Sequence, residues 1–296
     1  MPRTLPKALA EVLRHWQPDG DEGATPEVEA VFSTGHSNRN ILLRQGDQRF
    51  VVRLPSNDGE RLGVDRRVER RALALAEKIG LGAPVLYCDP RTGALVTRYL
   101  ESRPVRVEGI AADETIDRIV AALRTLHRQD LKLPLMNVAD RIRQYARDVQ
   151  LQRPRQWEQT RELLAAAQHV LERYRFTRWT DALCHNDLVA QNILEVDGGV
   201  RFVDWEYAGR GDPFFDLATL AEDNAFSLID RRRLLLSYGE IGDAALERLY
   251  RMRVMYRLLS VLWYMLRRKG RSTGLAAELR RQEQALRALL QRGPED

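Results

Sequence analysis

Over the first hundred residues, short runs of alternating hydrophobic and polar positions predict a small antiparallel sheet. Between two of these runs, apolar residues from 62 to 79 recur at helical spacing, which predicts a helix ending at Gly80. The strands are expected at 27–34, 40–45, 49–54, 85–88 and 94–99.

The pattern changes to helical spacing after a connector at 101–104. The helices are expected at 112–129, 138–150, 156–174, 231–239, 244–268 and 275–291. A strand-rich first part followed by a helix-rich second part predicts an α+β protein of two lobes, residues 1–100 and 101–296, with the site between them.

One hairpin interrupts the helices. Residues 192–196 and 200–204 read as strands, and Asp197-Gly-Gly199 between them is a strong hairpin signal. A hairpin returns the end of its second strand to the start of its first. Asp204 is therefore expected beside Asn192.

Just before this hairpin stands His185-Asn-Asp-Leu188, and Asn192 follows. This matches the H-x-D-x-x-x-x-N frame of a kinase catalytic loop. The frame predicts that Asp187 is the base for a hydroxyl substrate and that Asn192 and Asp204 supply oxygen ligands to Mg²⁺. An isolated H-x-D is usually a chance loop, but Asn192 in register and Asp204 at the hairpin end argue against chance.

Composition narrows the class. The chain has 296 residues, 44% of them hydrophobic and 30% charged, which is ordinary for a globular protein. It has no apolar run of about 18 residues, so no membrane span is expected, and the N-terminus lacks the apolar stretch of a signal peptide. Two cysteines, Cys88 and Cys184, are too few for a disulfide framework and fit a cytoplasmic location.

The formal net charge of +5 raises the possibility of nucleic-acid binding. The arginines are scattered among acidic residues along the helices, without a long basic block. A solvated, ion-paired surface is the better interpretation. We expect no nucleic-acid partner, and the charge also suits an anionic co-substrate such as ATP. The sequence pattern predicts no particular oligomeric state.

The segments Asp204-Trp-Glu-Tyr-Ala-Gly209 and Asp212-Pro-Phe-Phe-Asp-Leu-Ala218 resemble the aminoglycoside phosphotransferase and choline kinase superfamily, most closely its bacterial choline kinase and thiamine kinase branches. The resemblance extends from about residue 31 to 265. It implies a protein-kinase-like two-lobed fold, ATP and Mg²⁺ as cofactors, and a small alcohol as the partner substrate.

The candidate nucleotide-binding residues lie in the first predicted lobe. Kinases place a lysine on the third strand and pair it with a glutamate on the next helix. None of the four lysines lies on a predicted strand; Arg53 holds that position and Glu69 is its expected partner. An exposed strand arginine is the alternative. The resemblance adds a polar loop and a hinge, which give the remaining nucleotide candidates Ser37, Asn38, Asn40 and Tyr99. Without the rest of the chain, that loop would pass for an ordinary hairpin turn.

The acceptor side combines carboxylates with aromatic rings, which suits a cationic alcohol. Tyr256 and Trp263 are seven residues apart, so they share a helix face, although a buried core would give the same spacing. By resemblance Asp216 braces the catalytic loop. His127 is expected in the core or behind the site rather than as a ligand. The acceptor candidates are Glu206, Tyr207, Glu222, Tyr256 and Trp263.

Together these features predict a phosphotransferase that acts on a choline-like alcohol. Thiamine kinase is the first alternative. An aminoglycoside or sugar phosphotransferase comes next, but residues 244–268 are basic where such a site would carry carboxylates. A nucleotide-binding pseudokinase is the alternative without catalysis.

Overall fold

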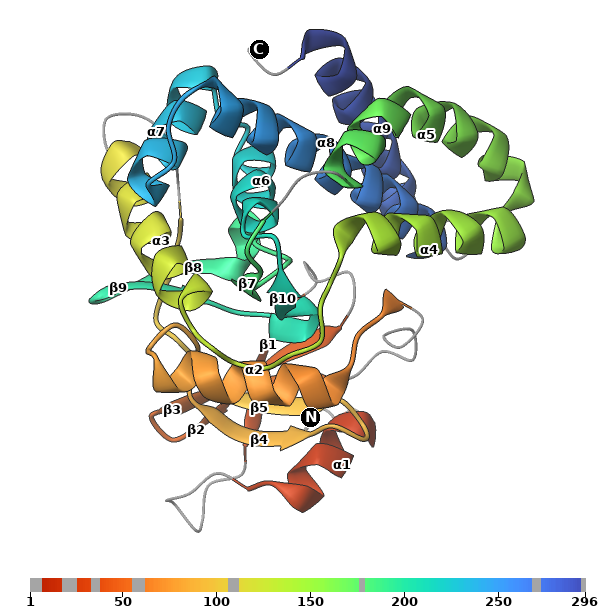
Figure 1. Cartoon of the computed structure of the whole chain (residues 1–296). Coiled ribbons are helices and arrows are strands. Elements are labelled where there is room, and N and C mark those ends of the chain that lie inside the picture. Colours follow the sequence, from red (N-terminus) through yellow and green to blue (C-terminus); the bar gives the residue numbers. More distant parts are fainter. Residues whose placement is uncertain are drawn as a thin grey trace. The chain divides into compact units, whose positions relative to one another are not determined.

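The computed structural model (Figure 1) describes residues 7–17, 26–32, 38–54, 62–105, 112–175, 179–267 and 273–293. The chain divides into two compact units. The first unit comprises Met1–Pro104 and Ile193–Ala208, and the second comprises Val105–Asn192 and Gly209–Asp296.

The first unit is built on a five-stranded antiparallel sheet in the order β1-β2-β3-β5-β4. All five predicted strands are confirmed, with ends that shift by one residue at most; the predicted end of the first strand, 33–34, lies outside the described residues. The strands are β1 (Glu27–Phe32), β2 (Arg39–Gln45), β3 (Gln48–Leu54), β4 (Val85–Asp89) and β5 (Ala94–Arg98). The alternation predicted from the sequence is visible in β3, where Phe50, Val52 and Leu54 are buried.

A helix that the sequence analysis missed, α1 (Lys7–His15), covers this buried face. Leu9 and Val12, one helical turn apart, pack into the same core as Phe50 and Val52. The nine-residue helix gains its stability from this packing, since helices this short are marginal alone.

The crossing helix α2 (Arg66–Lys78) begins four residues later than predicted. Asp65 causes the shift, because its carboxylate accepts hydrogen bonds from the backbone N–H groups of Arg67 and Val68 and so caps the helix. The cap places Glu69 in the first turn, on the buried side of the helix.

The predicted hairpin is formed by β8 (Ile193–Val196) and β9 (Gly199–Phe202), and β6 (Arg103–Pro104) pairs with β8. Ile193 pairs with Phe202, so the first strand begins where the second ends. Strand β9 stops two residues before Asp204, because Asp204 adopts a left-handed φ of 63° and the chain enters the 3₁₀ turn η4 (Trp205–Tyr207).

The second unit is mainly helical, and all of its predicted helices are confirmed. Helix α8 is buried on most of its circumference and contacts α4, α5, α6 and α9. In the parts of the chain that the structure describes, no helix is long and apolar enough to cross a membrane. The helices are α3 (Ala112–His127), α4 (Val138–Gln152), α5 (Pro154–Arg175), α6 (Phe214–Asp223), α7 (Leu228–Tyr238), α8 (Asp243–Arg267) and α9 (Thr273–Arg292).

A short antiparallel pair, β7 (Ala182–Cys184) with β10 (Gly209–Gly211), lies among these helices. The chain before α4 runs close beside β10: the Met136 N–H donates to the Arg210 carbonyl at 2.7 Å. A Cβ at Gly211 would lie 3.3 Å from the Met136 carbonyl oxygen, so glycine permits the approach. Both cysteines are thiols; Cys184 is buried and Cys88 half-buried.

Candidate active site

The predicted base, Asp187, follows directly after β7 in a braced turn. The backbone N–H groups of His185 and Asn186 donate to the two carboxylate oxygens of Asp216 on α6, at 2.8 and 2.7 Å. Asn186 has a φ of 63°, in the left-handed region that few non-glycine residues adopt. Asp216 is fully buried, and it holds this turn in place. The predicted bracing role of Asp216 is confirmed.

His127 holds Asp216 from α3. Its Nε2 lies 3.1 Å from Asp216 Oδ2, and its Nδ1 lies 2.8 Å from the Tyr238 hydroxyl. Nε2 must be the donor, because a carboxylate can only accept. Burial raises the pKa of Asp216, but His127 and the donors of the catalytic loop outweigh burial and hold that pKa below its ordinary value. His127 therefore holds Asp216, which is one of the two positions predicted for it.

The end of α6 supplies a second brace that the sequence analysis did not identify. Asp223 Oδ2 accepts a hydrogen bond from the Ala190 N–H at 2.6 Å, at the start of the 3₁₀ turn η3 (Ala190–Asn192). Asp216 and Asp223 are seven residues apart and share a helix face. That spacing was the signal available in the sequence.

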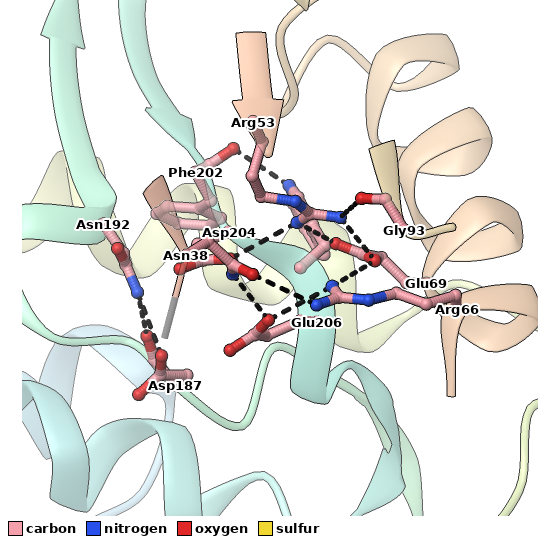
Figure 2. A network of polar contacts seen from close by, with 11 residues as sticks. Asn38, Arg53, Arg66, Glu69, Gly93, Asp187, Asn192, Phe202, Asp204 and Glu206 are labelled. Atoms are coloured by element: carbon pink, nitrogen blue, oxygen red, sulfur yellow. Dashed lines mark hydrogen bonds and ion pairs between the residues drawn. The ribbon is translucent and has the colours of Figure 1, made fainter. Parts of the chain in front are cut away.

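Asn192 is oriented by the predicted base, Asp187 (Figure 2). Its side-chain Nδ2 donates to the Asp187 carbonyl at 2.9 Å and to Asp187 Oδ2 at 3.2 Å. Both bonds use the amide nitrogen, which leaves the amide oxygen as the atom that a metal ion would take. An amide oxygen is a hard ligand of the kind Mg²⁺ prefers.

Arg53 and Glu69 form the predicted ion pair in the first unit. Arg53 Nη1 contacts Glu69 Oε1, and Nη2 donates to Glu69 Oε2 at 2.8 Å (Figure 2). The side chains are only 5% and 1% exposed. Burial lowers the pKa of Arg53, but Glu69 outweighs burial and raises it, so the guanidinium stays charged. The planar fork of arginine suits this two-pronged contact and would suit phosphate oxygens equally.

Asp204 has the properties of a metal ligand. Its Oδ1 is buried and lies 3.7 Å from Arg53 Nη1, and no described residue donates a hydrogen bond to it. Burial and the neighbouring carboxylate of Glu206 raise the pKa of Asp204 to about 7. A divalent cation would relieve both effects, so the residues present fit a Mg²⁺ ligand at Asp204.

Glu206 contacts residues of the nucleotide side. Its Oε2 accepts hydrogen bonds from Asn38 Nδ2 at 2.9 Å and from Arg66 Nη1 at 3.1 Å (Figure 2). Arg66 also donates to Asn38 Oδ1 at 3.2 Å and to Glu69 Oε2 at 2.8 Å. Glu206 was predicted among the acceptor residues, and Arg66 was not predicted. This polar cluster has a formal charge of −1, which favours a bound cation. It contains two guanidiniums and three carboxylates: Arg53, Arg66, Glu69, Asp204 and Glu206.

The other nucleotide candidates are placed differently. Asn40 lies opposite Arg53 across the β2–β3 pair, so their side chains share a sheet face. The Tyr99 N–H donates to the Arg49 carbonyl at 3.0 Å, and the Arg49 guanidinium lies 5.0 Å from the Tyr99 ring centre. Ser37 lies outside the described residues.

Glu222, an acceptor candidate, is buried between two arginines of α8. Its carboxylate oxygens accept from Arg253 Nε and Arg257 Nε, each at 2.5 Å. Arg257 Nη2 also donates to the Glu222 carbonyl at 2.7 Å. The charge of Glu222 is thus already balanced within the second unit.

The aromatic candidates differ in exposure. Tyr256 is buried with its ring edge-on to Phe215, whereas Trp263 is half-buried with the Arg267 guanidinium 5.6 Å from its ring centre. Burial raises the pKa of the Tyr256 hydroxyl, and the carboxylates of Asp223 and Asp187 add to the rise. Tyr256 therefore lies within electrostatic reach of the predicted base.

Tyr207, the last acceptor candidate, lies in η4 of the first unit and is half-buried. The second unit thus brings Tyr256 near the Asp187 loop and encloses Glu222 in an ion-paired cluster, while Glu206 and Tyr207 belong to the first unit.

Curated relatives include protein LicA, an ethanolamine kinase and a thiamine kinase. Protein LicA of Haemophilus influenzae is 31% identical over 193 residues, which is 64% of this chain and 56% of that protein. Ethanolamine kinase 1 of Mus musculus is 26% identical over 235 residues (70% and 60%). Thiamine kinase of Escherichia coli is 28% identical over 219 residues (70% and 69%). The match spans less than two thirds of the first two of these proteins.

Solved structures share the fold. Choline kinase LicA from Streptococcus pneumoniae superposes with a TM-score of 0.73 at 22% identity, over 88% of this chain and 95% of that one. The streptomycin–ATP–APH(2")-IIa ternary complex gives 0.66 at 15% identity, over 100% and 99%. These similarities confirm the predicted two-lobed, protein-kinase-like α+β fold. The model of the phosphotransferase enzyme family (APH) matches residues 29–252, and the chain belongs to that family.

Proposed function

We propose that this protein transfers the γ-phosphoryl group of ATP, with Mg²⁺, to the hydroxyl of a small cationic alcohol of the choline type. The observation that carries the proposal is the braced catalytic loop, in which Asp216 and Asn192 orient Asp187. A carboxylate held in this way can accept the proton of an attacking hydroxyl.

Nucleotide binding is assigned to residues 1–100. Arg53, held by Glu69, presents its guanidinium to the phosphates, and Asn38 and Asn40 form the polar border of that site. Ser37, which lies outside the described residues, is assigned to the same site from the sequence alone. Backbone groups near Tyr99 bind the adenine. The catalytic loop and acceptor site are assigned to residues 101–296, of which Ile193–Ala208 clusters with the first compact unit.

Mg²⁺ binding is assigned to the amide oxygen of Asn192 and the carboxylate of Asp204. When bound, the ion neutralises charge on the phosphates. Asn192 immediately precedes Ile193, which pairs with Phe202, two residues before Asp204. This register supports a shared role for both ligands, and Asn192 keeps Asp187 oriented through its amide nitrogen.

For the acceptor, Tyr256, Trp263 and Tyr207 supply aromatic surface, and Glu222 with Glu206 were the carboxylates expected beside it. Because Glu222 is already ion-paired with Arg253 and Arg257, we assign acceptor binding mainly to the aromatic rings. The Arg267 guanidinium lies 5.6 Å from the Trp263 ring centre, and this contact supports the proposal that the ring can face a cation. Named choline, ethanolamine and thiamine kinases among the similar proteins support a cationic primary alcohol.

Trp263→Ala tests this assignment. A cation on a desolvated ring gains roughly 2 kcal/mol, so KM for a quaternary acceptor should rise about 30-fold. The KM for ATP should stay almost unchanged. An unchanged KM for the acceptor would remove Trp263 from the site.

The test of the function itself is a screen of ADP release with choline, ethanolamine, thiamine, aminoglycosides and amino sugars, with Asp187→Asn as the inactive control. Turnover of choline above ethanolamine supports the proposal. Turnover of thiamine or a sugar alone would replace the acceptor class and keep the phosphotransferase assignment. If no acceptor releases ADP while the protein binds ATP, the pseudokinase alternative holds; it is disfavoured because Asp187, Asn192 and Asp204 are all present.

The two thiols favour a cytoplasmic location as part of the same proposal.

A further inference from the structure

We propose that Arg66, Asn38 and Glu206 form a closed hydrogen-bonded ring that positions the nucleotide and metal groups of the first unit, with Arg66 as a positioning residue. The inference rests on the proposed function. Glu206 is thereby assigned to nucleotide binding instead of acceptor binding.

Each of the three side chains contacts the other two (Figure 2). Arg66 Nη1 and Asn38 Nδ2 both donate to Glu206 Oε2, and Arg66 Nη2 donates to Asn38 Oδ1. The amide of Asn38 is used at both ends, as donor to a carboxylate and as acceptor from a guanidinium. Neither aspartate nor an aliphatic residue could satisfy both neighbours.

The ring is buried. The side chains of Arg66 and Glu206 are 13% and 2% exposed, and Asn38 is 8% exposed. Buried charges hold a single geometry only when their hydrogen bonds are complete. If Arg66 served only as the partner of Glu69, three residues later on α2, its contacts with Asn38 and Glu206 would not be needed.

The ring joins three segments that are distant in the sequence. Asn38 precedes β2, Arg66 is the first residue of α2, and Glu206 lies in η4. The ring lies next to the proposed phosphate and metal groups, Arg53 and Asp204. Arg66 also donates to Glu69, which is the ion-pair partner of Arg53, and Glu206 is two residues from Asp204. A change in the ring should therefore alter phosphate and metal binding and leave acceptor binding unchanged.

The positioning role of the ring can be tested by exchanging the amide of Asn38 and the carboxylate of Glu206. Asn38→Asp places a carboxylate against Glu206, and we expect the Kd for Mg·ADP to rise by at least about tenfold from buried like-charge repulsion. In the double variant Asn38→Asp with Glu206→Gln, the net charge is that of the wild type. The new amide nitrogen donates to the new carboxylate, while the amide oxygen must turn to accept from Arg66. The double variant should recover to within about threefold of wild type, because the two changes are coupled.

Arg66→Met should weaken Mg·ADP binding by at least about tenfold, since it leaves a buried carboxylate without its cation. Arg66→Lys should recover part of this, because an ammonium restores the charge but lacks the guanidinium fork. Arg71→Met, on the exposed face of α2, is the matched control.

Calorimetric titration with Mg·ADP, thermal unfolding, and KM values for ATP and acceptor measure these effects. If wild type does not bind Mg·ADP, the proposed function itself is wrong. If wild type binds and Asn38→Asp binds equally well, or the folded double variant fails to recover, the ring has no positioning role. A rise in the acceptor KM of Arg66→Met, with Mg·ADP binding unchanged, would also overturn the inference.

Discussion

Asp216→Asn would test how the catalytic loop keeps its shape. Three donors converge on this buried carboxylate: the N–H groups of His185 and Asn186, and the imidazole of His127. Asparagine has nearly the same shape but only one acceptor oxygen. Its NH₂ group would face at least one of these donors, and that donor would lose its partner inside the protein.

The magnitude follows from these contacts. A hydrogen bond to a charged group contributes about 1.5–3 kcal/mol, and a buried donor left unsatisfied adds a penalty of about 1–3 kcal/mol. We therefore expect Asp216→Asn to lower the free energy of unfolding by about 3–5 kcal/mol, a large share of the 5–15 kcal/mol typical of a domain. Turnover should fall with it, because Asn186 keeps its left-handed conformation, next to Asp187, only while the brace holds.

Urea unfolding of wild type and variant at pH 7 measures the loss, and steady-state kinetics separates kcat from KM. Asp140→Asn is the control, since the Asp140 side chain is exposed and forms a surface ion pair with Arg143, so the change should alter stability by less than about 1 kcal/mol. A loss below about 1 kcal/mol for Asp216→Asn, with normal kcat, would refute the bracing role.

The pH dependence has a definite sign. Because the folded-state pKa of Asp216 is lowered, its contribution to stability is present above the pKa of the unfolded chain, about 3.9. That contribution is lost as pH falls through the lower folded-state pKa. The stability difference between wild type and Asp216→Asn should therefore be constant near neutral pH and narrow below about pH 4. A difference that widened in acid would contradict the sign.

Three further outcomes are expected. Asp187→Asn should lower kcat by at least about a hundredfold while ATP still binds, measured by ADP release and nucleotide titration; near-normal turnover would exclude Asp187 as the base. Asp204→Ala should abolish turnover and raise the Mg²⁺ concentration needed for nucleotide binding, and an unchanged metal dependence would exclude Asp204 as a ligand. Asn186→Gly should be tolerated better than Asn186→Ala by about 1 kcal/mol in urea unfolding, because glycine adopts the left-handed φ without strain; equal stabilities would count against strain at this position.

Periodicity predicted the strands and helices because each element buries one face. The three-residue spacing in α1 was present but short, and only packing against Phe50 makes it a helix. The starts of α2 and α7 depended on capping side chains, Asp65 and Ser227, which act on backbone N–H groups and leave no periodic signal.

The proposed base and metal ligands were accessible from the sequence because they lie close together along the chain. Asp187 and Asn192 are five residues apart, and one hairpin separates Asn192 from Asp204. Arg66 was not predicted, and Asn38 was a candidate only through the family resemblance. Their partner Glu206 is 140 and 168 residues away, and only the folded chain shows which polar side chains meet.

Backbone strain is concentrated where the chemistry is proposed. Among the described residues, three that are not glycine have positive φ, and two of them are Asn186, which precedes the base, and Asp204. A left-handed residue costs about 1–2 kcal/mol, and asparagine and aspartate bear it better than other residues. Asp216 offsets the cost at Asn186 with two charged hydrogen bonds. At Asp204 no described residue donates to the buried oxygen, so the strain and the crowded carboxylates leave a position that a divalent cation would stabilise.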